Sequence, residues 1–186
     1  MTISDEKKAA LAAKFGLMPP TTVKETASAV EYERVEPKAI WEILPGVAIG
    51  PLHLGMTSQQ LEETLHQARE AWGVVSPLEE QTDMAFPGTK GITVRYMDDV
   101  LFVLVRYVEN QAQELTVDRM TADCVQLMVE EIPVFRENAG ELSQRLGLTK
   151  GELGYERPGL LLWQEGFRDD EPFDFATVSC FAEKGE

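Results

Sequence analysis

Apolar residues recur with a helical period most clearly between Ser58 and Trp72. Leu61, Leu65, Ala68 and Trp72 are spaced by three or four positions, and the positions between them are mostly polar. This pattern is typical of a helix that buries one face and leaves the other in water. The sequence therefore predicts a helix over 58–72.

The start of this helix carries its own signals. Thr57 and Gln60 have the spacing of a capping box, in which each side chain satisfies an amide of the first turn. Met56 and Leu61 occupy the two positions of a hydrophobic staple. Upstream, the segment 40–56 places apolar residues between glycines and prolines, which predicts short extended pieces separated by turns.

A period of two residues marks a different kind of element farther along. Ile92, Val94 and Tyr96 alternate with polar residues, and the segment 100–108 is almost continuously apolar. Asp98 and Asp99 can turn the chain between them. We predict a hairpin here, with its second strand more deeply buried. The segment 115–132 fits both a strand and a helix, and its periodicity does not decide between them.

The same succession recurs in the second half. Asn138 and Glu141 form a second capping pattern, Leu142 and Leu146 give a short apolar face, and Gly147 stands where a helix would stop. Two strands are then expected at 159–163 and 175–181, joined by the polar stretch 164–174.

Together these elements predict an α+β fold, an antiparallel sheet of hairpins packed with two or three helices. Residues 38–186 form a single domain in this interpretation, and a duplication of about 40–110 and 120–186 is one explanation of the recurrence. Residues 1–37 are predicted to be an arm over the domain surface, with a short helix from Ser4 to Phe15 that ends before Gly16 and Pro19.

The net charge of the chain indicates which kinds of partner this fold can bind. The 186 residues include 32 acidic and 17 basic ones, which gives a formal net charge of −15 at pH 7. Nucleic acids and anionic membranes would be repelled, whereas a basic protein would be attracted. We therefore expect a basic protein as partner, with a homo-oligomer formed through the sheet edge as an alternative.

Cysteine use indicates a reducing compartment. Cys124 and Cys180 have no CxxC spacing and no histidine at metal-ligand spacing, so both are expected to be reduced, buried thiols. The N-terminus lacks the basic start and apolar core of a signal peptide, and no segment has the length of a membrane span. The sequence predicts a cytoplasmic protein without metal or cofactor.

The stretch 44–57, LPGVAIGPLHLGMT, resembles an opening of many uncharacterised bacterial proteins, in which a glycine-punctuated strand leads into "LGMT" and a helix. More remotely, "GMT" followed by a helix and a hairpin is similar to the SmpA/BamE-like fold, which includes envelope lipoproteins and inhibitor proteins. The resemblance covers about residues 40–108. Here Ala71-Trp72-Gly73 replaces the usual Leu-Gly-x-Pro ending, and no lipoprotein signal is present. The resemblance transfers no catalytic residues.

Candidate catalytic groups are few. His53 and His66 are the two histidines, and neither has a sequence partner that indicates a triad or a metal site. Cys124 would need one of them nearby to act as a nucleophile, and its apolar neighbours indicate burial instead. No catalytic residue is assigned.

The candidate partner-binding site is the loop that joins the last two strands. It interleaves aromatic and acidic residues, which suits contact with a basic surface because the rings anchor and the charges steer. The residues are Glu165, Phe167, Asp169, Asp170, Glu171, Phe173 and Asp174. The structural alternative is a solvated loop whose phenylalanines fold back onto the core.

Three function classes follow from these observations. The first is a non-enzymatic acidic binding protein, for example an immunity or inhibitor protein for a basic toxin or nuclease. The second is an enzyme or small-molecule binder with a pocket between the sheet and the helices. The third is a structural component that forms a homo-oligomer.

Overall fold

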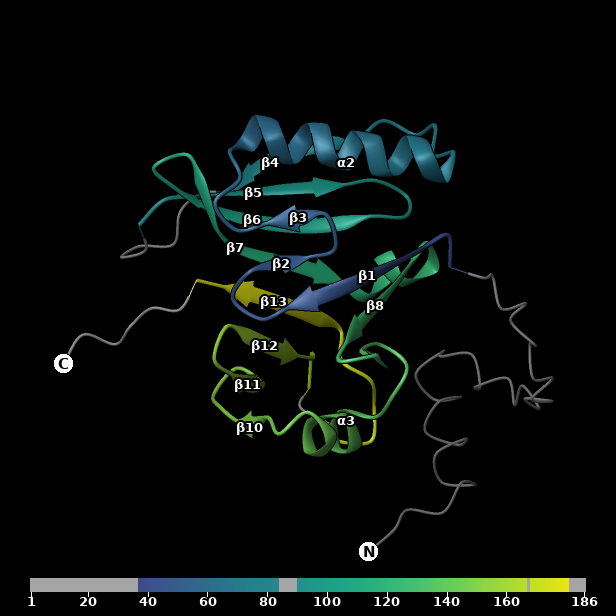
Figure 1. Cartoon of the computed structure of the whole chain (residues 1–186), viewed down its shortest axis with the longest axis vertical. Helices are drawn as coiled ribbons and strands as arrows, with labels where there is room; N and C mark the ends of the chain where they lie inside the picture. The colour runs from purple at the N-terminus through teal and green to yellow at the C-terminus, as the bar shows by residue number, and fades with distance from the viewer. Residues whose placement is uncertain (1–36, 84–89, 167, 181–186) are drawn as a thin grey trace, which may run out of the picture. The chain divides into compact units, whose positions relative to one another are not determined.

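Two β-sheets, of eight and five strands, form the frame of the part of the chain that the structure describes (Figure 1). The computed structural model describes residues 37–83, 90–166 and 168–180, which all belong to one compact unit, 35–186. The predicted α+β class is confirmed. The predicted N-terminal helix and nearly all of the arm lie outside the described residues.

The large sheet consists of two meanders joined side by side. Its strand order is β10-β11-β12-β13-β7-β6-β5-β4, and every neighbouring pair is antiparallel. Strands β7 and β13 meet at the centre. The strands are β4 (Glu79–Asp83), β5 (Ile92–Met97), β6 (Phe102–Val108), β7 (Gln111–Asp118), β10 (Thr149–Lys150), β11 (Tyr155–Arg157), β12 (Leu160–Trp163) and β13 (Phe175–Ser179).

The small sheet has the order β3-β2-β1-β8-β9 and contains one parallel pair, β1 with β8. This pair links segments that are far apart in the sequence. The strands are β1 (Ala39–Leu44), β2 (Ala48–Ile49), β3 (Leu52–His53), β8 (Val125–Val129) and β9 (Ile132–Pro133). The expected short extended pieces in 40–56 are confirmed as β1 to β3. Gly50 has φ +56°, and a side chain there would collide with the Trp41 ring, so this turn requires glycine.

Helix α2 (Ser58–Trp72) has the predicted bounds and the predicted capping box between Thr57 and Gln60. It ends at Gly73, which adopts a left-handed conformation. Helix α3 (Ala139–Arg145) follows Asn138 as predicted, but the Asn138 side chain makes no capping hydrogen bond, so that part of the prediction is wrong. Among the described residues, neither helix is long and apolar enough to cross a membrane.

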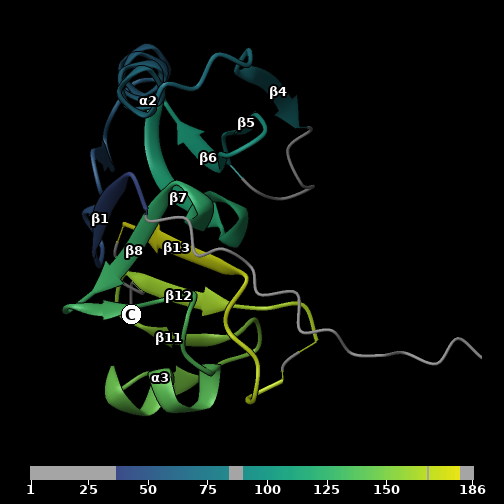
Figure 2. The same ribbon diagram turned by 90° about the vertical axis from the view of Figure 1, so that its right-hand side faces the viewer.

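One face of the large sheet is covered and the other is not. Helix α2 and the small sheet lie against the covered face, where they enclose a single hydrophobic core that also receives residues of α3 (Figure 2). Alternate residues of β6, such as Val103 and Val105, point into this core and are fully buried. The described residues place no α-helix and no second sheet against the other face, which we call the uncovered face.

This arrangement corrects two expectations. The apolar run 100–108 predicted a second hairpin strand that is more deeply buried, but this strand is fully buried on one face only: Phe102 and Leu104 are half-buried, because they lie on the uncovered face. The ambiguous segment 115–132 divides into the end of β7, a 3₁₀ helix at Arg119–Asp123, and β8. It therefore contains both strand and helix, in different parts.

The two halves share an order of elements. In each, short strands of the small sheet are followed by a helix and then by a four-stranded meander of the large sheet. The last strands of the two meanders, β7 and β13, pair at the centre of the sheet, and the earlier strands of each meander lie successively farther out on either side. Common ancestry of the halves stays a prediction, and this repeated order supports it.

Candidate binding surface

A groove with a volume of about 1090 Å³ lies on the uncovered face. Its floor is formed by β7, β12 and β13, and the β10–β11 hairpin borders it with Leu153, which is 69% exposed. Paired residues place Leu161, Thr177 and Thr116 in one row across the three strands, and Leu104 of β6 continues that row. The floor is thus largely apolar.

The polar part of the floor satisfies itself. The hydroxyls of Thr116 and Thr177 are 2.9 Å apart, and each residue is about 95% buried, with exposures of 5% and 6%. Because each hydroxyl already has a hydrogen-bond partner, the pair does not require a polar ligand to satisfy it. The groove therefore favours apolar contact at its centre.

Two aromatic rings bound this floor on one side. Trp163 and Phe175 are directly paired across β12 and β13, and their rings stack with centroids 3.9 Å apart and an interplanar angle of 14°. Trp163 lines the groove, while Phe175 lines a second hollow of about 420 Å³. The stacked rings thus join the two depressions into one continuous surface.

The second hollow is acidic. Asp118, Glu165 and Asp174 line it together with Phe175, and Arg119 is the one basic residue among its lining. Arg119 is 3.3 Å from Asp174, and the amide of Glu165 donates to the other carboxylate oxygen of Asp174. Three carboxylates against one guanidinium leave this hollow with a negative charge.

Charges at the groove itself are mostly paired. Glu114 is 3.3 Å from Arg106, and Arg157 is 2.7 Å from Glu130 and also donates to the Leu146 carbonyl. Glu156 lines the groove and is exposed. The groove and the acidic hollow together therefore present an apolar centre with an acidic margin.

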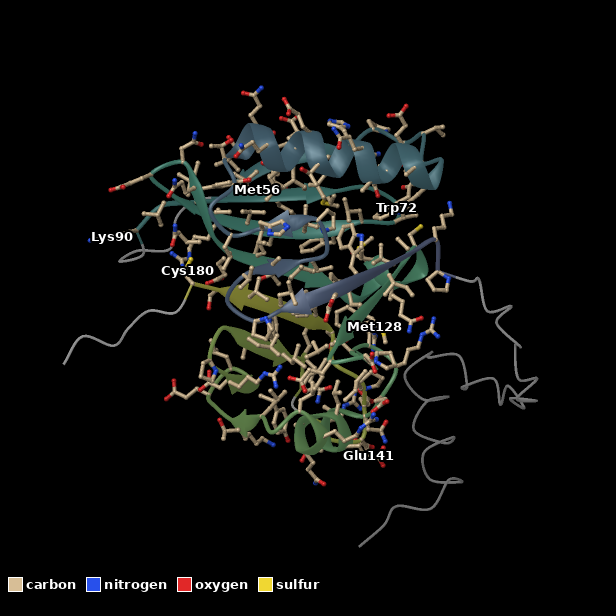
Figure 3. All side chains as sticks on the ribbon, viewed as in Figure 1. Met56, Trp72, Lys90, Met128, Glu141 and Cys180 are labelled. Carbon is tan, nitrogen blue, oxygen red and sulfur yellow. The ribbon has the colours of Figure 1, made fainter. Side chains whose placement is uncertain are left out.

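Cys180 lies at the end of β13, where Figure 3 labels it, and its free thiol lines one end of the groove. It is exposed, so the expectation that both cysteines are buried is wrong for Cys180 and confirmed for Cys124. Among the described residues that line the groove there is no histidine and no lysine. These described residues therefore offer the thiol no imidazole base.

The structure divides the predicted acidic loop between several environments. Glu165 and Asp174 lie together in the acidic hollow. Asp169 accepts a 2.6 Å hydrogen bond from the Tyr155 hydroxyl and is 3.3 Å from the Lys150 ammonium. The Tyr155 hydrogen bond and the Lys150 ammonium lower the pKa of Asp169. Asp169 therefore attaches its part of the predicted acidic loop to the β10–β11 hairpin.

The remaining loop residues differ in what they offer a partner. Glu171 is 2.8 Å from Arg168, and Asp170 is exposed. Phe173 is fully buried, where its ring packs edge-on against Tyr155, so it is not available as the exposed anchor that the sequence predicted. Phe167 lies outside the described residues. Of the predicted set, Glu165 and Asp174 join the surface defined here.

Sequence reasoning missed the residues that form the groove. The sequence predicts a strand at 159–163 that contains Leu161 and Trp163, but it does not predict on which face of the sheet these side chains lie. A signal was present, because 160–163 is apolar at every position, which is more than a strand with one buried face requires.

The other candidate groups do not converge. His53 is exposed on β3, and His66 is exposed on α2, where it lies 3.7 Å from Glu62. Cys124 is buried beside the start of β8. Within the described part of the chain, no group of three or more metal-ligating side chains is close enough to hold an ion.

No family model matches the chain, and no match was found among curated proteins or among solved structures.

Proposed function

We propose that this chain is a non-enzymatic binding protein that holds a basic protein partner against the uncovered face of its large sheet. The observation that carries the proposal is the surface centred on Trp163 and Phe175, apolar in the middle and acidic at its margin. Contiguous apolar area on an uncovered sheet face marks an interaction site in a soluble protein. Tryptophan at the centre of such an area is the residue type that contributes most to binding.

Charge defines the partner. The chain carries a net charge of −15, and Asp118, Glu165 and Asp174 gather beside the apolar centre. A partner with basic groups around an apolar patch would gain both contact and electrostatic steering. An immunity or inhibitor protein for a basic toxin or nuclease is one concrete form of this function.

The test compares co-purification from native lysate at low salt for the wild type and for Trp163→Ala. Loss of a central tryptophan is expected to weaken binding by about 2 kcal/mol or more. Leu161→Ala provides a milder second variant on the same floor, and both are checked for an unchanged melting temperature. Val75→Ala is the matched control, because Val75 is 98% exposed and does not line the groove.

A stoichiometric partner that binds the wild type and Val75→Ala, but not Trp163→Ala, would support the proposal. A chain that stays alone at low salt, or a partner retained equally by all variants, would contradict it.

A second candidate function rests on the volume of the groove. About 1090 Å³ lies at the upper end of the range of small-molecule sites, and Leu104, Leu161 and Trp163 would suit an apolar ligand. The site differs from the pocket expected from sequence, because it lies on the side of the sheet away from α2. Quenching of Trp163 fluorescence by an apolar dye, lost in Trp163→Phe, would favour this function.

A further inference from the structure

Strand β4 forms one edge of the large sheet, and its outer side has no neighbour among the described strands. It pairs only with β5, over five residues and without a bulge. Glu79, Glu80, Gln81 and Thr82 are all exposed. An edge of this kind presents a row of free amides and carbonyls to which another strand can bind.

The other described edges are much shorter. Strand β10 at the opposite edge of the same sheet, and β3 and β9 at the edges of the small sheet, each have two residues. Short edges are one way in which proteins prevent unwanted pairing, as are an internal proline, a bulge or a lysine. Strand β4, EEQTD, has no proline, no lysine and no bulge; its charged residues also disfavour pairing with most strands, but they are all acidic and so do not disfavour a basic one.

The charge of this edge restricts what can pair with it. Glu79, Glu80 and Asp83 belong to β4, and the segment 74–83 contains no lysine or arginine. On the helix side, Glu80 lies close enough to the buried Tyr96 to add to the effect of burial, which raises the pKa of Tyr96, and Glu62 of α2 acts in the same way. One carboxylate of β4 and one of α2 thus lie near Tyr96 on that side of the sheet.

A second copy of the chain is a poor occupant for this edge. Pairing of β4 with β4 would bring carboxylates close to carboxylates, and like charges across a strand pair are destabilising. A strand with lysine or arginine opposite these positions would be stabilised by the same geometry.

We propose that β4 accepts an extended basic segment of a partner protein as a ninth strand of the large sheet. The inference does not depend on the groove, because β5 and β6 separate β4 from β7. Backbone pairing would provide affinity, and the carboxylates would select for basic side chains.

The test titrates the full chain with a short peptide that alternates lysine with threonine and follows amide hydrogen exchange. Binding should slow exchange within Glu79–Asp83 by about tenfold, because newly paired amides become protected. The same peptide with alternate amides N-methylated should not bind, since it cannot form the strand ladder. A peptide that alternates glutamate with threonine should not bind either.

Charge reversal provides the matched variants. Glu79→Lys with Glu80→Lys should weaken binding of the lysine peptide by about tenfold or more. Glu131→Lys with Glu152→Lys makes the same change in net charge at exposed sites of the second half, and it should change affinity by less than about twofold.

Several results would overturn the proposal. These are no binding of the lysine peptide, protection confined to β12 and β13, protection without peptide of the β4 amides that point away from β5, or a dimer of the free chain in light scattering. Protection at β12 and β13 would still support the groove, so the two proposals can fail separately.

Discussion

A buried ion pair is the residue contact that sequence patterns did not anticipate. Arg69 lies on the buried side of α2, and its guanidinium donates to Asp98 and to the Ser76 carbonyl. The Asp98 side chain has no exposed surface, and it also accepts from the amides of Val100 and Leu101 at 2.7 and 2.8 Å. This contact joins α2, the loop after it and the β5–β6 turn.

Removing one partner should be far more damaging than the loss of a surface charge. Asp98→Ala leaves the Arg69 guanidinium buried without its carboxylate, and we expect it to lower the free energy of unfolding by about 3–5 kcal/mol. Urea unfolding at pH 7 measures this difference. Asp99→Ala is the matched control, since Asp99 is the exposed neighbour and should change stability by less than about 0.5 kcal/mol. Equal effects of the two substitutions would contradict this interpretation.

At the scale of elements, the loop 164–174 is held to α3 and to the β10–β11 hairpin. The amides of Ala139 and Gly140 donate to the carbonyls of Glu171 and Asp169, at 2.8 and 3.0 Å. The Tyr155 hydroxyl adds the side-chain contact to Asp169. The loop therefore supports the acidic hollow from a fixed position.

This attachment should depend on pH. The pKa of Asp169 is lowered from its ordinary value of 3.8, chiefly by the Tyr155 hydrogen bond. A carboxyl group with a depressed folded-state pKa stabilises the fold above its unfolded-state value, and the effect is lost as pH falls through the folded-state value. We expect Tyr155→Phe to raise the pKa of Asp169 toward 3.8, as measured by its carboxyl carbon shift in NMR.

The exchange protection of Ala139 and Gly140 should decrease in the wild type as pH falls below 3.8 through the lowered pKa of Asp169, and in Tyr155→Phe it should decrease at a pH nearer 3.8. An unchanged Asp169 titration in the variant would show that the hydroxyl does not stabilise the carboxylate.

Elements could be predicted where local signals agreed. For α2, the period, the capping box at Thr57 and the hydrophobic staple all favour the same helix, and the structure has the predicted bounds. The sequence did not predict strand β4, because EEQTD has low strand propensity. Its extended conformation depends on pairing with β5. In 115–132 the chain changes from strand to 3₁₀ helix to strand within one window, so no single period fits.

The candidate site was harder to predict than the elements. The sequence shows that 164–174 is acidic and aromatic, but whether Phe173 points inward depends on Tyr155. The groove depends on the register of β7, β12 and β13, which come from distant parts of the chain. Among the described members of the predicted set, Glu165 and Asp174 lie on the candidate binding surface.

At the scale of the molecule, the halves share one sheet and one core. Buried residues of both halves belong to a single cluster, and the Thr116–Thr177 hydrogen bond crosses the pair of strands where the halves meet. Because the β7–β13 and β1–β8 pairs each join one half to the other, we expect the described domain to unfold as one cooperative unit.

Tryptophan positions allow this to be tested. Trp41 and Trp72 lie in the first half and contact each other, whereas Trp163 lies in the second. In Trp163→Phe, the remaining fluorescence reports only the first half. We expect its urea transition to coincide with the transition in far-ultraviolet circular dichroism. Two separated transitions would show that the halves unfold independently.

The central place of β13 has a consequence for biosynthesis. It is the last described strand along the chain, yet it lies between β7 and β12 in the middle of the sheet. Until 175–179 has left the ribosome, β7 and β12 each present a hydrophobic edge with no strand between them. During that interval we expect the nascent chain to be exposed to aggregation and to depend most on the cell's chaperones.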